Sequence, residues 1–186
     1  FPYGQLAESE EAESWSQADA SFDFSALQFE ADEFNATSKY LKKGIALMPI
    51  CFGISFTKTP MNQARSLVHV YTDGSVAVST GAVEMGQGVN TKMAQVAAAV
   101  FGLDVTMVKV HTTNTLRIAN TSPTAASAAA DLNGKATQIA CETIRERLLD
   151  VAASMLGKET SEGVALSDVD WKDLVMEAHL RRVNLS

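Results

Sequence analysis

The stretch GAVEMGQGVNTKMAQVAAAVFG, residues 81–102, places three glycines around Gln87 and then becomes apolar and rich in alanine. From Val89 onward the apolar residues recur at helical spacing, and Gly102 follows the last of them. The stretch therefore predicts a glycine turn that leads into a helix over residues 88–101. Glycines at such a junction let a ligand approach the backbone, and free amides at a helix start favour an anion. Gln87 would offer that ligand both an amide donor and a carbonyl acceptor.

The preceding segment, SLVHVYTDGSVAVSTG, predicts a β-hairpin. Valines alternate with other residues on both sides of Asp73-Gly74, which is the pattern of two strands joined by a primed turn. His69 is expected on the outer face of the first strand. The second strand then delivers the chain to Gly81 and to the glycine turn.

A second helix start follows a predicted strand at residues 105–113. In NTSPTAASAAADLNGKA, Ser122 is a candidate cap and Pro123 suits the first turn, so a helix is predicted over residues 124–155. Its early residues are small enough for a bulky ligand to lie against them, although close helix packing would explain small residues equally well. The predicted core face of this helix consists of Leu132, Ala136, Ile139, Ala140, Ile144, Leu148, Val151 and Met155.

The remaining segments complete a prediction of one α+β fragment over residues 1–186. Residues 1–20 read as an extended lead-in, residues 23–39 as a helix capped by Asp23 or Ser25, and residues 42–57 as an extended strand interrupted near Pro49. The tail, residues 157–186, is expected to hold one short helix capped near Ser167 or Asp168. The expected fold is a small, mainly antiparallel sheet with two major helices packed on it.

Composition limits the classes of partner. The chain has 186 residues, 46% hydrophobic content and a formal charge of -7, which disfavours nucleic acid and anionic membranes as partners. Many carboxylates fall between Glu8 and Glu33. Cys51 and Cys141 lie in apolar runs without CxxC spacing and are expected to be buried thiols in a reducing compartment. With no membrane-spanning run, no signal peptide and no initial methionine, the chain is interpreted as a cytoplasmic fragment.

Three segments in order carry a resemblance to a known family. They are KKGIALMPICFGISFT, HVYTDGSVAVSTGAVEMGQGVNTKMAQVAA and NTSPTAASAAADLNGKA. Together they resemble the molybdenum-cofactor (molybdopterin) subunit of the xanthine dehydrogenase and aldehyde oxidase family, and look more similar to xanthine dehydrogenases. The resemblance spans nearly the whole chain.

The resemblance implies which residues bind the cofactor. Gln87 would point toward the molybdenum centre, and the backbone of Ala126 would also lie near the metal. Lys92 would supply a positive charge beside the cofactor. The full set of implied cofactor-binding residues is Met85, Gly86, Gln87, Gly88, Lys92, Thr124, Ala125, Ala126, Ser127 and Ala128. Gln87 and the segment 122–127 should then face each other across one cleft, with the Gln87 amide toward the backbone of Ala125 and Ala126.

The family's general base, a glutamate in a Gly-Glu-Pro context, does not occur in this sequence. Glu84 is followed by Met85 and is not nominated as that base, so no catalytic residue is assigned. The iron–sulfur clusters and the FAD domain would also lie elsewhere in a larger, dimeric oxidoreductase that hydroxylates purines with water as the oxygen source. The chain alone is expected to bind no molybdenum and to be inactive. The alternatives are an aldehyde oxidase-like hydroxylase of aldehydes or N-heterocycles, and a non-catalytic degenerate module used for subunit contact.

Overall fold

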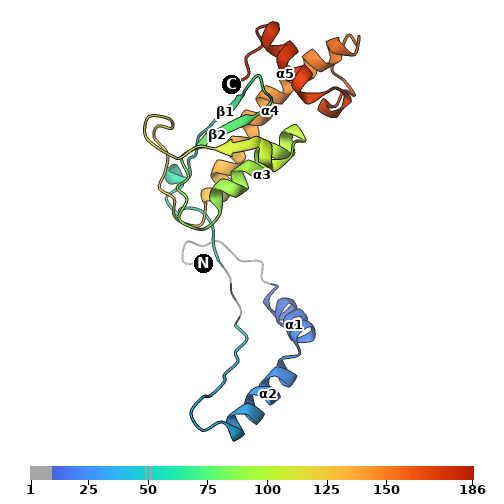
Figure 1. The fold of residues 1–186 in the computed structure, drawn as a ribbon. Helices are drawn as coiled ribbons and strands as arrows, with labels where there is room; N and C mark the ends of the chain where they lie inside the picture. Colours follow the sequence, from blue (N-terminus) through green and yellow to red (C-terminus); the bar gives the residue numbers. More distant parts are fainter. Residues whose placement is uncertain (1–9, 49, 51) are drawn as a thin grey trace. The chain divides into compact units, whose positions relative to one another are not determined.

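The computed structural model describes residues 10–48, 50 and 52–186, and the chain divides into two compact units with the boundary after Phe52 (Figure 1). The first unit contains α1 (Glu11–Phe22) and α2 (Phe24–Thr37). Asp23 lies between them in the left-handed conformation, with φ 46°, and its carboxylate accepts a hydrogen bond from the Ala26 amide at 3.1 Å. The helix predicted over residues 23–39 and its Asp23 cap are therefore confirmed.

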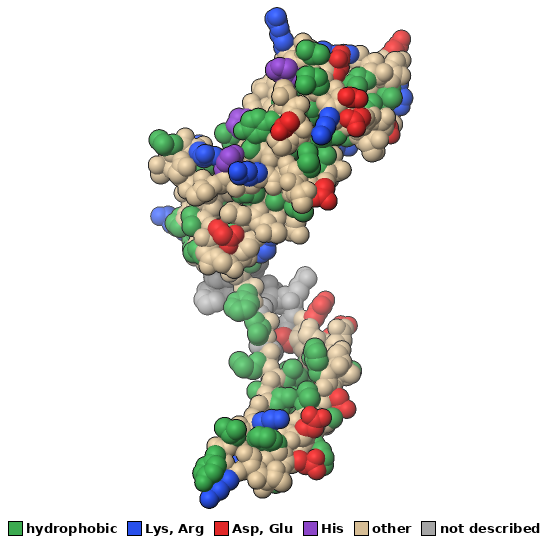
Figure 2. Space-filling model, in the orientation of Figure 1, with side chains coloured by type: hydrophobic (Ala, Val, Ile, Leu, Met, Phe, Trp, Pro, Cys, Tyr) green, Lys and Arg blue, Asp and Glu red, His purple; other side chains and the backbone are tan. Residues whose placement is uncertain are grey.

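The expectation of an extended lead-in is wrong for residues 11–20, which belong to α1. This helix has no buried residue, so it lacks the apolar period by which helices are recognised in a sequence. It is supported locally instead, for example by Gln17 Nε2 donating to Glu13 Oε1 at 2.9 Å. Figure 2 shows acidic side chains over the surface of this unit, as the charge distribution of the sequence predicts.

The strand predicted over residues 42–57 is also wrong for the part of that range which the structure describes. These residues form no strand, and Met48, Ile50 and Phe52 are 73%, 70% and 81% exposed. A strand exists only where a neighbour accepts its ladder hydrogen bonds, and the apolar composition of a segment does not supply that neighbour. The predicted interruption at Pro49 and the predicted buried thiol of Cys51 lie outside the described residues.

The second unit is built on a three-stranded sheet in the order β1-β2-β3. β1 (Ser66–Val70) and β2 (Val76–Thr80) are antiparallel, with Val68 opposite Val78, and this confirms the hairpin. The turn is not primed, because Gly74 is in the left-handed region, with φ 86°, and Asp73 is not. The Gly74 amide donates to the Tyr71 carbonyl at 2.8 Å, which is the geometry of a three-residue loop ending in a left-handed glycine. β3 (Val108–Val110) pairs with β2 in parallel, so the sheet is mixed.

Two helices pack against each other and against this sheet. α3 (Val89–Phe101) contacts β2 and β3, and α4 (Ala129–Met155) contacts β1 and β2. Gly88 and Gly102 flank α3 with φ of 76° and 69°. This confirms the predicted helix between a glycine turn and Gly102. Short 3₁₀ turns lie at Thr59–Met61 (η1), Val105–Met107 (η2) and Leu166–Asp168 (η3). The α+β fold with two major helices is therefore confirmed.

The predicted start of α4 is wrong. The helix begins at Ala129, five residues later than expected, and Ser122 does not cap it. Ala126 and Ser127 adopt φ of 55° and 54°, a left-handed conformation that no α-helix can contain. Its buried face also differs from the predicted one, since Ile139 is 53% exposed and Met155 is 37% exposed. The buried residues of α4 are Asn133, Gly134, Thr137, Cys141, Ile144, Leu148, Val151, Ala152 and Ala153.

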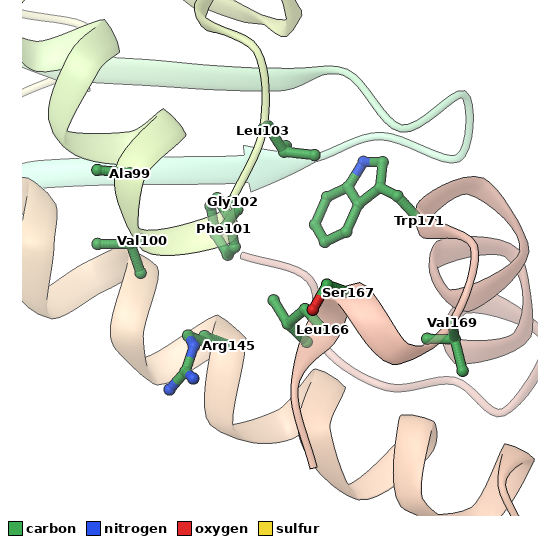
Figure 3. A pocket seen from close by; sticks show the side chains of 10 residues that line it. All are labelled: Ala99, Val100, Phe101, Gly102, Leu103, Arg145, Leu166, Ser167, Val169 and Trp171. Carbon is green, nitrogen blue, oxygen red and sulfur yellow. The ribbon is translucent and has the colours of Figure 1, made fainter.

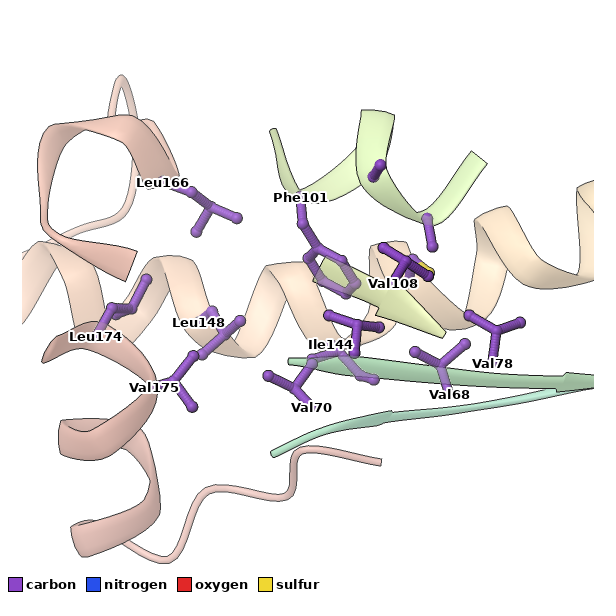
Figure 4. Close-up of a cluster of buried hydrophobic side chains, with 14 of the residues drawn as sticks. Val68, Val70, Val78, Phe101, Val108, Ile144, Leu148, Leu166, Leu174 and Val175 are labelled. Carbon is purple, nitrogen blue, oxygen red and sulfur yellow. The ribbon is translucent and has the colours of Figure 1, made fainter. Parts of the chain in front are cut away.

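The tail packs the last helix, α5 (Trp171–Leu180), onto this unit. Its cap is Asp170, whose carboxylate accepts from the Lys172 and Asp173 amides, and not Ser167 or Asp168 as expected. Trp171 Nε1 donates to the Gly74 carbonyl at 2.8 Å and so ties α5 to the hairpin. Figure 4 shows Leu174 and Val175 of α5 beside Leu148 of α4, and Ile144 of α4 near Val70 and Phe101.

Cys141 lies in this core and is fully buried. Burial raises the pKa of its thiol to about 12, because a thiolate there would lose its hydration. The expected buried thiol is therefore confirmed at this position. Among the described residues, no helix is both long and apolar enough to cross a lipid bilayer.

Candidate functional site

The glycine turn before α3 is organised by Glu84. Its Oε1 accepts hydrogen bonds from the Gly86 and Gly88 amides at 3.0 and 2.9 Å, and its Oε2 accepts from the Asn90 amide at 3.0 Å. The Asn90 and Gly88 amides hold the pKa of this carboxyl below its usual value. Two of the amides at the start of α3, those of Gly88 and Asn90, are therefore engaged by the protein's own carboxylate, contrary to the expectation of free amides there.

Gln87 uses both ends of its side-chain amide within the same turn. Its Nε2 donates to the Val83 carbonyl at 2.9 Å, and its Oε1 accepts from the Met85 amide at 2.6 Å. The amide therefore fixes the shape of the turn. The hydrogen bonds of the amide go to this turn, whereas its expected orientation was toward the backbone of Ala125 and Ala126.

The turn and the segment before α4 nevertheless border one pocket of about 360 Å³. Gln87 and Lys92 lie on the α3 side, and Thr124 and Ser127 lie on the α4 side. The lining residues are Met85, Gln87, Val89, Lys92, Thr124, Ala125, Ser127, Ala129 and Ala130. Six of the ten residues nominated from the sequence are thus brought together.

The other four nominated residues shape the pocket without lining it. Gly86 and Gly88 adopt φ of 97° and 76°, which a residue with a Cβ rarely adopts, and they let the turn close around Glu84. Ala126 accepts a hydrogen bond from the Ser55 amide at 3.0 Å through its carbonyl. Ala128 is buried and caps α4.

The pocket offers few, separated polar groups. They are the Lys92 ammonium and the Thr124 and Ser127 hydroxyls, together with the Gln87 amide. Ala125, Ala129 and Ala130 leave backbone and methyl surface between them, and the Lys92 ammonium favours negative charge on a ligand that lies against this wall. No cluster of three or more His, Cys, Asp or Glu side chains suited to a metal occurs in the described part of the chain.

A second hollow, of about 240 Å³, lies at the other end of α3. Figure 3 shows the Trp171 indole beside Leu103 and Phe101, and the Trp171 and Phe101 ring centroids are 5.6 Å apart. Arg145 and Ser167 are the polar side chains among its lining residues. This hollow shares no residue with the first pocket, and it marks where the tail packs on α3.

Sequence reasoning missed Glu84 and Ser55 as parts of this site. A carboxylate that precedes two closely spaced glycines at a predicted helix start is a usable signal for an acceptor of the turn and helix amides, which is what Glu84 is. No local signal marks Ser55, because its partner Ala126 lies far along the chain.

Residues 17–186 match the family model described as the molybdopterin cofactor-binding domain. The chain belongs to this family. Its molybdopterin cofactor-binding domain is 50% identical to xanthine dehydrogenase 1 of Arabidopsis thaliana over 139 residues, which are 75% of this chain and 10% of that protein. It is 42% identical to the xanthine dehydrogenase/oxidase of Mus musculus over 172 residues, or 92% of this chain and 12% of that protein.

Among solved structures, this molybdopterin cofactor-binding domain is similar to quinoline 2-oxidoreductase from Pseudomonas putida 86. The TM-score is 0.53 at 26% sequence identity, and the match covers 64% of this chain and 16% of that chain. The 186 residues thus span about a tenth of the length of the xanthine dehydrogenases named above. The family assignment agrees with the resemblance carried by the three sequence motifs.

Proposed function

We propose that this chain forms part of the molybdopterin-binding region of a xanthine dehydrogenase-like molybdenum hydroxylase. The enzyme would hydroxylate purines such as hypoxanthine and xanthine, with water as the oxygen source. The observation that carries the proposal is the single pocket bordered by Gln87 and Lys92 on one side and by Thr124, Ala125 and Ser127 on the other. The relatedness to xanthine dehydrogenases supports the purine as substrate.

The residues of the pocket suit a pterin that carries a phosphate. Lys92 would pair with negative charge, and the Ser127 hydroxyl would donate a hydrogen bond. Ala125, Ala129 and Ala130 would let the flat ring system lie against the backbone, and Ala126 would lie near the metal end. The bound cofactor would supply the two-electron redox centre of the reaction. None of these residues is assigned as a direct metal ligand.

Glu84 is not the general base in this proposal. Both of its carboxylate oxygens accept backbone hydrogen bonds, and these lower its pKa, so its affinity for a substrate proton is reduced. The base, the iron–sulfur clusters and the FAD site would be contributed by other parts of a larger, dimeric, cytoplasmic enzyme. This fits a chain that spans about a tenth of its relatives.

The decisive experiment compares Gln87→Ala with Gln95→Ala in the full-length protein. Gln95 is an exposed residue of α3 outside the pocket and is the matched control. Gln87→Ala should lower molybdenum content or xanthine turnover about tenfold to a hundredfold, because two hydrogen bonds that hold the turn are lost. Unchanged metal content and turnover in Gln87→Ala would contradict the proposal.

Two further assays separate the alternatives. Turnover of an aldehyde in preference to xanthine by the full-length protein would favour an aldehyde oxidase-like enzyme, and no turnover with stoichiometric cofactor would favour a non-catalytic module. The 186-residue chain by itself is expected to contain no molybdenum and to oxidise no xanthine, because other parts of the proposed enzyme would contribute the rest of the cofactor-binding site. Stoichiometric molybdenum in the purified chain would overturn that expectation.

A further inference from the structure

Thr80, the last residue of β2, and residues 81–83, which leave the sheet after it, are held by threonines of the segment that follows β3. Thr113 Oγ1 lies 2.8 Å from the Thr80 carbonyl oxygen and 2.7 Å from the Ala82 carbonyl oxygen. The Val83 amide donates to Thr124 Oγ1 at 2.9 Å. The chain between the sheet and the glycine turn is thus held at Thr80, Ala82 and Val83 by the segment 113–124.

Gly81 completes this contact by its lack of a side chain. A Cβ built on Gly81 would lie 2.4 Å from Thr121 Oγ1 and 2.5 Å from Thr121 Cγ2, closer than real contacts allow. Thr121 therefore packs directly on the Gly81 backbone. The close approach keeps the Thr113 hydroxyl within reach of the carbonyls on either side of Gly81.

The Thr113 hydroxyl takes the place of the backbone amide that would donate to the Thr80 carbonyl if the parallel pairing continued. The parallel pairing of β2 with β3 continues one step beyond β3, where the His111 amide donates to the Val78 carbonyl at 2.8 Å. Two residues further along each segment, Thr80 accepts from the side chain of Thr113. A side-chain donor satisfies this buried carbonyl and lets the backbone of Thr113 leave the sheet, toward the segment that borders the pocket.

The hydroxyl has one proton for two carbonyls, so it bridges them or alternates between them. Thr80 and Ala82 are each 1% exposed, and removal of the hydroxyl would deprive both carbonyls of this donor. The consequence reaches Gln87, because Gln87 Nε2 donates to the carbonyl of Val83, the next residue. A shift of residues 80–83 would move the acceptor on which the Gln87 side chain depends.

We infer that Thr113 is a positioning residue for the pocket. Its hydroxyl ends the parallel pairing of β2 with β3 and, through residues 80–83, holds the Val83 carbonyl where Gln87 binds it. Thr113 itself does not line the pocket. The inference concerns the geometry of the pocket, and only its consequence for cofactor content rests on the proposed function.

The test measures NMR solvent-exchange rates of the Val83 amide and the Gln87 side-chain amide in the 186-residue chain. Thr113→Val, which removes the hydroxyl and keeps the shape, should raise both rates about threefold to tenfold, the effect of one lost hydrogen bond. Thr113→Ser keeps the hydroxyl and should restore the wild-type rates. Thr112→Val, at an exposed neighbouring position, is the control and should change neither rate.

Unchanged rates in Thr113→Val, or equal effects of Thr113→Val and Thr113→Ser, would overturn the inference. A uniform rise that includes the amides of the β1–β2 ladder would also overturn it, because that result is global destabilisation. Should Thr113→Val fail to fold, Thr113→Ala removes the same hydroxyl without a methyl in its place, and the same criteria apply.

A second measurement separates this inference from the proposed function. In the full-length protein, Thr113→Val should lower molybdenum content severalfold, and Thr113→Ser should not. Altered exchange in the 186-residue chain together with unchanged molybdenum in the full-length variant would uphold Thr113 as a positioning residue and contradict the proposed ligand of the pocket.

Discussion

At the scale of single residues, Gly81 has no room for a side chain. Because Thr121 occupies the volume that a Cβ would need, Gly81→Ala should displace the segment 80–83 and destabilise the fold by about 1 to 3 kcal/mol. The free energy of unfolding from urea denaturation measures this effect. Thr121→Ala in the Gly81→Ala background should recover part of the loss, and Gly44→Ala, where nothing lies within 4 Å, is the control. Equal effects of Gly81→Ala and Gly44→Ala would contradict the packing argument.

Glu84 stabilises the glycine turn through its ionised carboxylate, which accepts hydrogen bonds from the turn's amides. Its pKa lies below the usual 4.5 in the folded chain, chiefly because of the Asn90 and Gly88 amides. The stabilising contribution is therefore complete above about pH 4.5 and is lost as the pH falls through the lowered pKa. The protection factor of the Gly88 amide, its intrinsic exchange rate at each pH divided by the rate measured by NMR, should fall in that acidic range in the wild-type chain.

Glu84→Gln should exchange the Gly88 amide faster already at pH 7 and should lose most of the acid-dependent change. Glu146→Gln, at an exposed position of α4, serves as the control and should keep the wild-type profile. A Glu84→Gln profile that retains the full acid dependence would show that another group is responsible.

At the scale of an element, α5 depends on Asp170 for its start. The carboxylate accepts from the Lys172 and Asp173 amides at 2.9 and 3.1 Å. Asp170→Ala should lower the free energy of unfolding by about 1 kcal/mol, the usual cost of losing an N-cap. Thermal unfolding measures the change, with the exposed loop residue Glu162→Ala as control. No difference between these variants would mean that tertiary packing alone holds α5.

At the scale of the molecule, Leu148 joins the layers of the second unit. It is fully buried in the cluster that includes Val70 of β1 and Val175 of α5. Leu148→Ala should cost about 2 to 5 kcal/mol, because it removes buried apolar contacts and leaves a cavity. Leu180→Ala, at a position that is 69% exposed, should cost far less. The midpoints of urea denaturation measure both changes. A far larger loss in Leu148→Ala than in Leu180→Ala indicates a core shared by the layers, and similar losses would contradict it.

Several features were predictable from the sequence because their causes lie within a few residues along the chain. The β1–β2 hairpin follows from alternation around Asp73-Gly74, and α3 follows from helical periodicity between two glycines. The candidate site was predictable in part, since the glycine turn and the small residues before α4 mark two places of close backbone approach. The prediction that these two places border one site came from the family resemblance.

Tertiary structure alone decided the rest, because the partners involved are distant in sequence. The parallel pairing of β3 with β2 and the late start of α4 both depend on hydrogen bonds that no local pattern specifies. The Thr113 hydroxyl contacts two carbonyls that lie more than 30 positions away along the chain. A sequence determines its turns and periodic faces through neighbouring side chains. The pairing of buried carbonyls with donors depends on the packed structure. Packing excludes water from these carbonyls, so each must then find a donor within the protein.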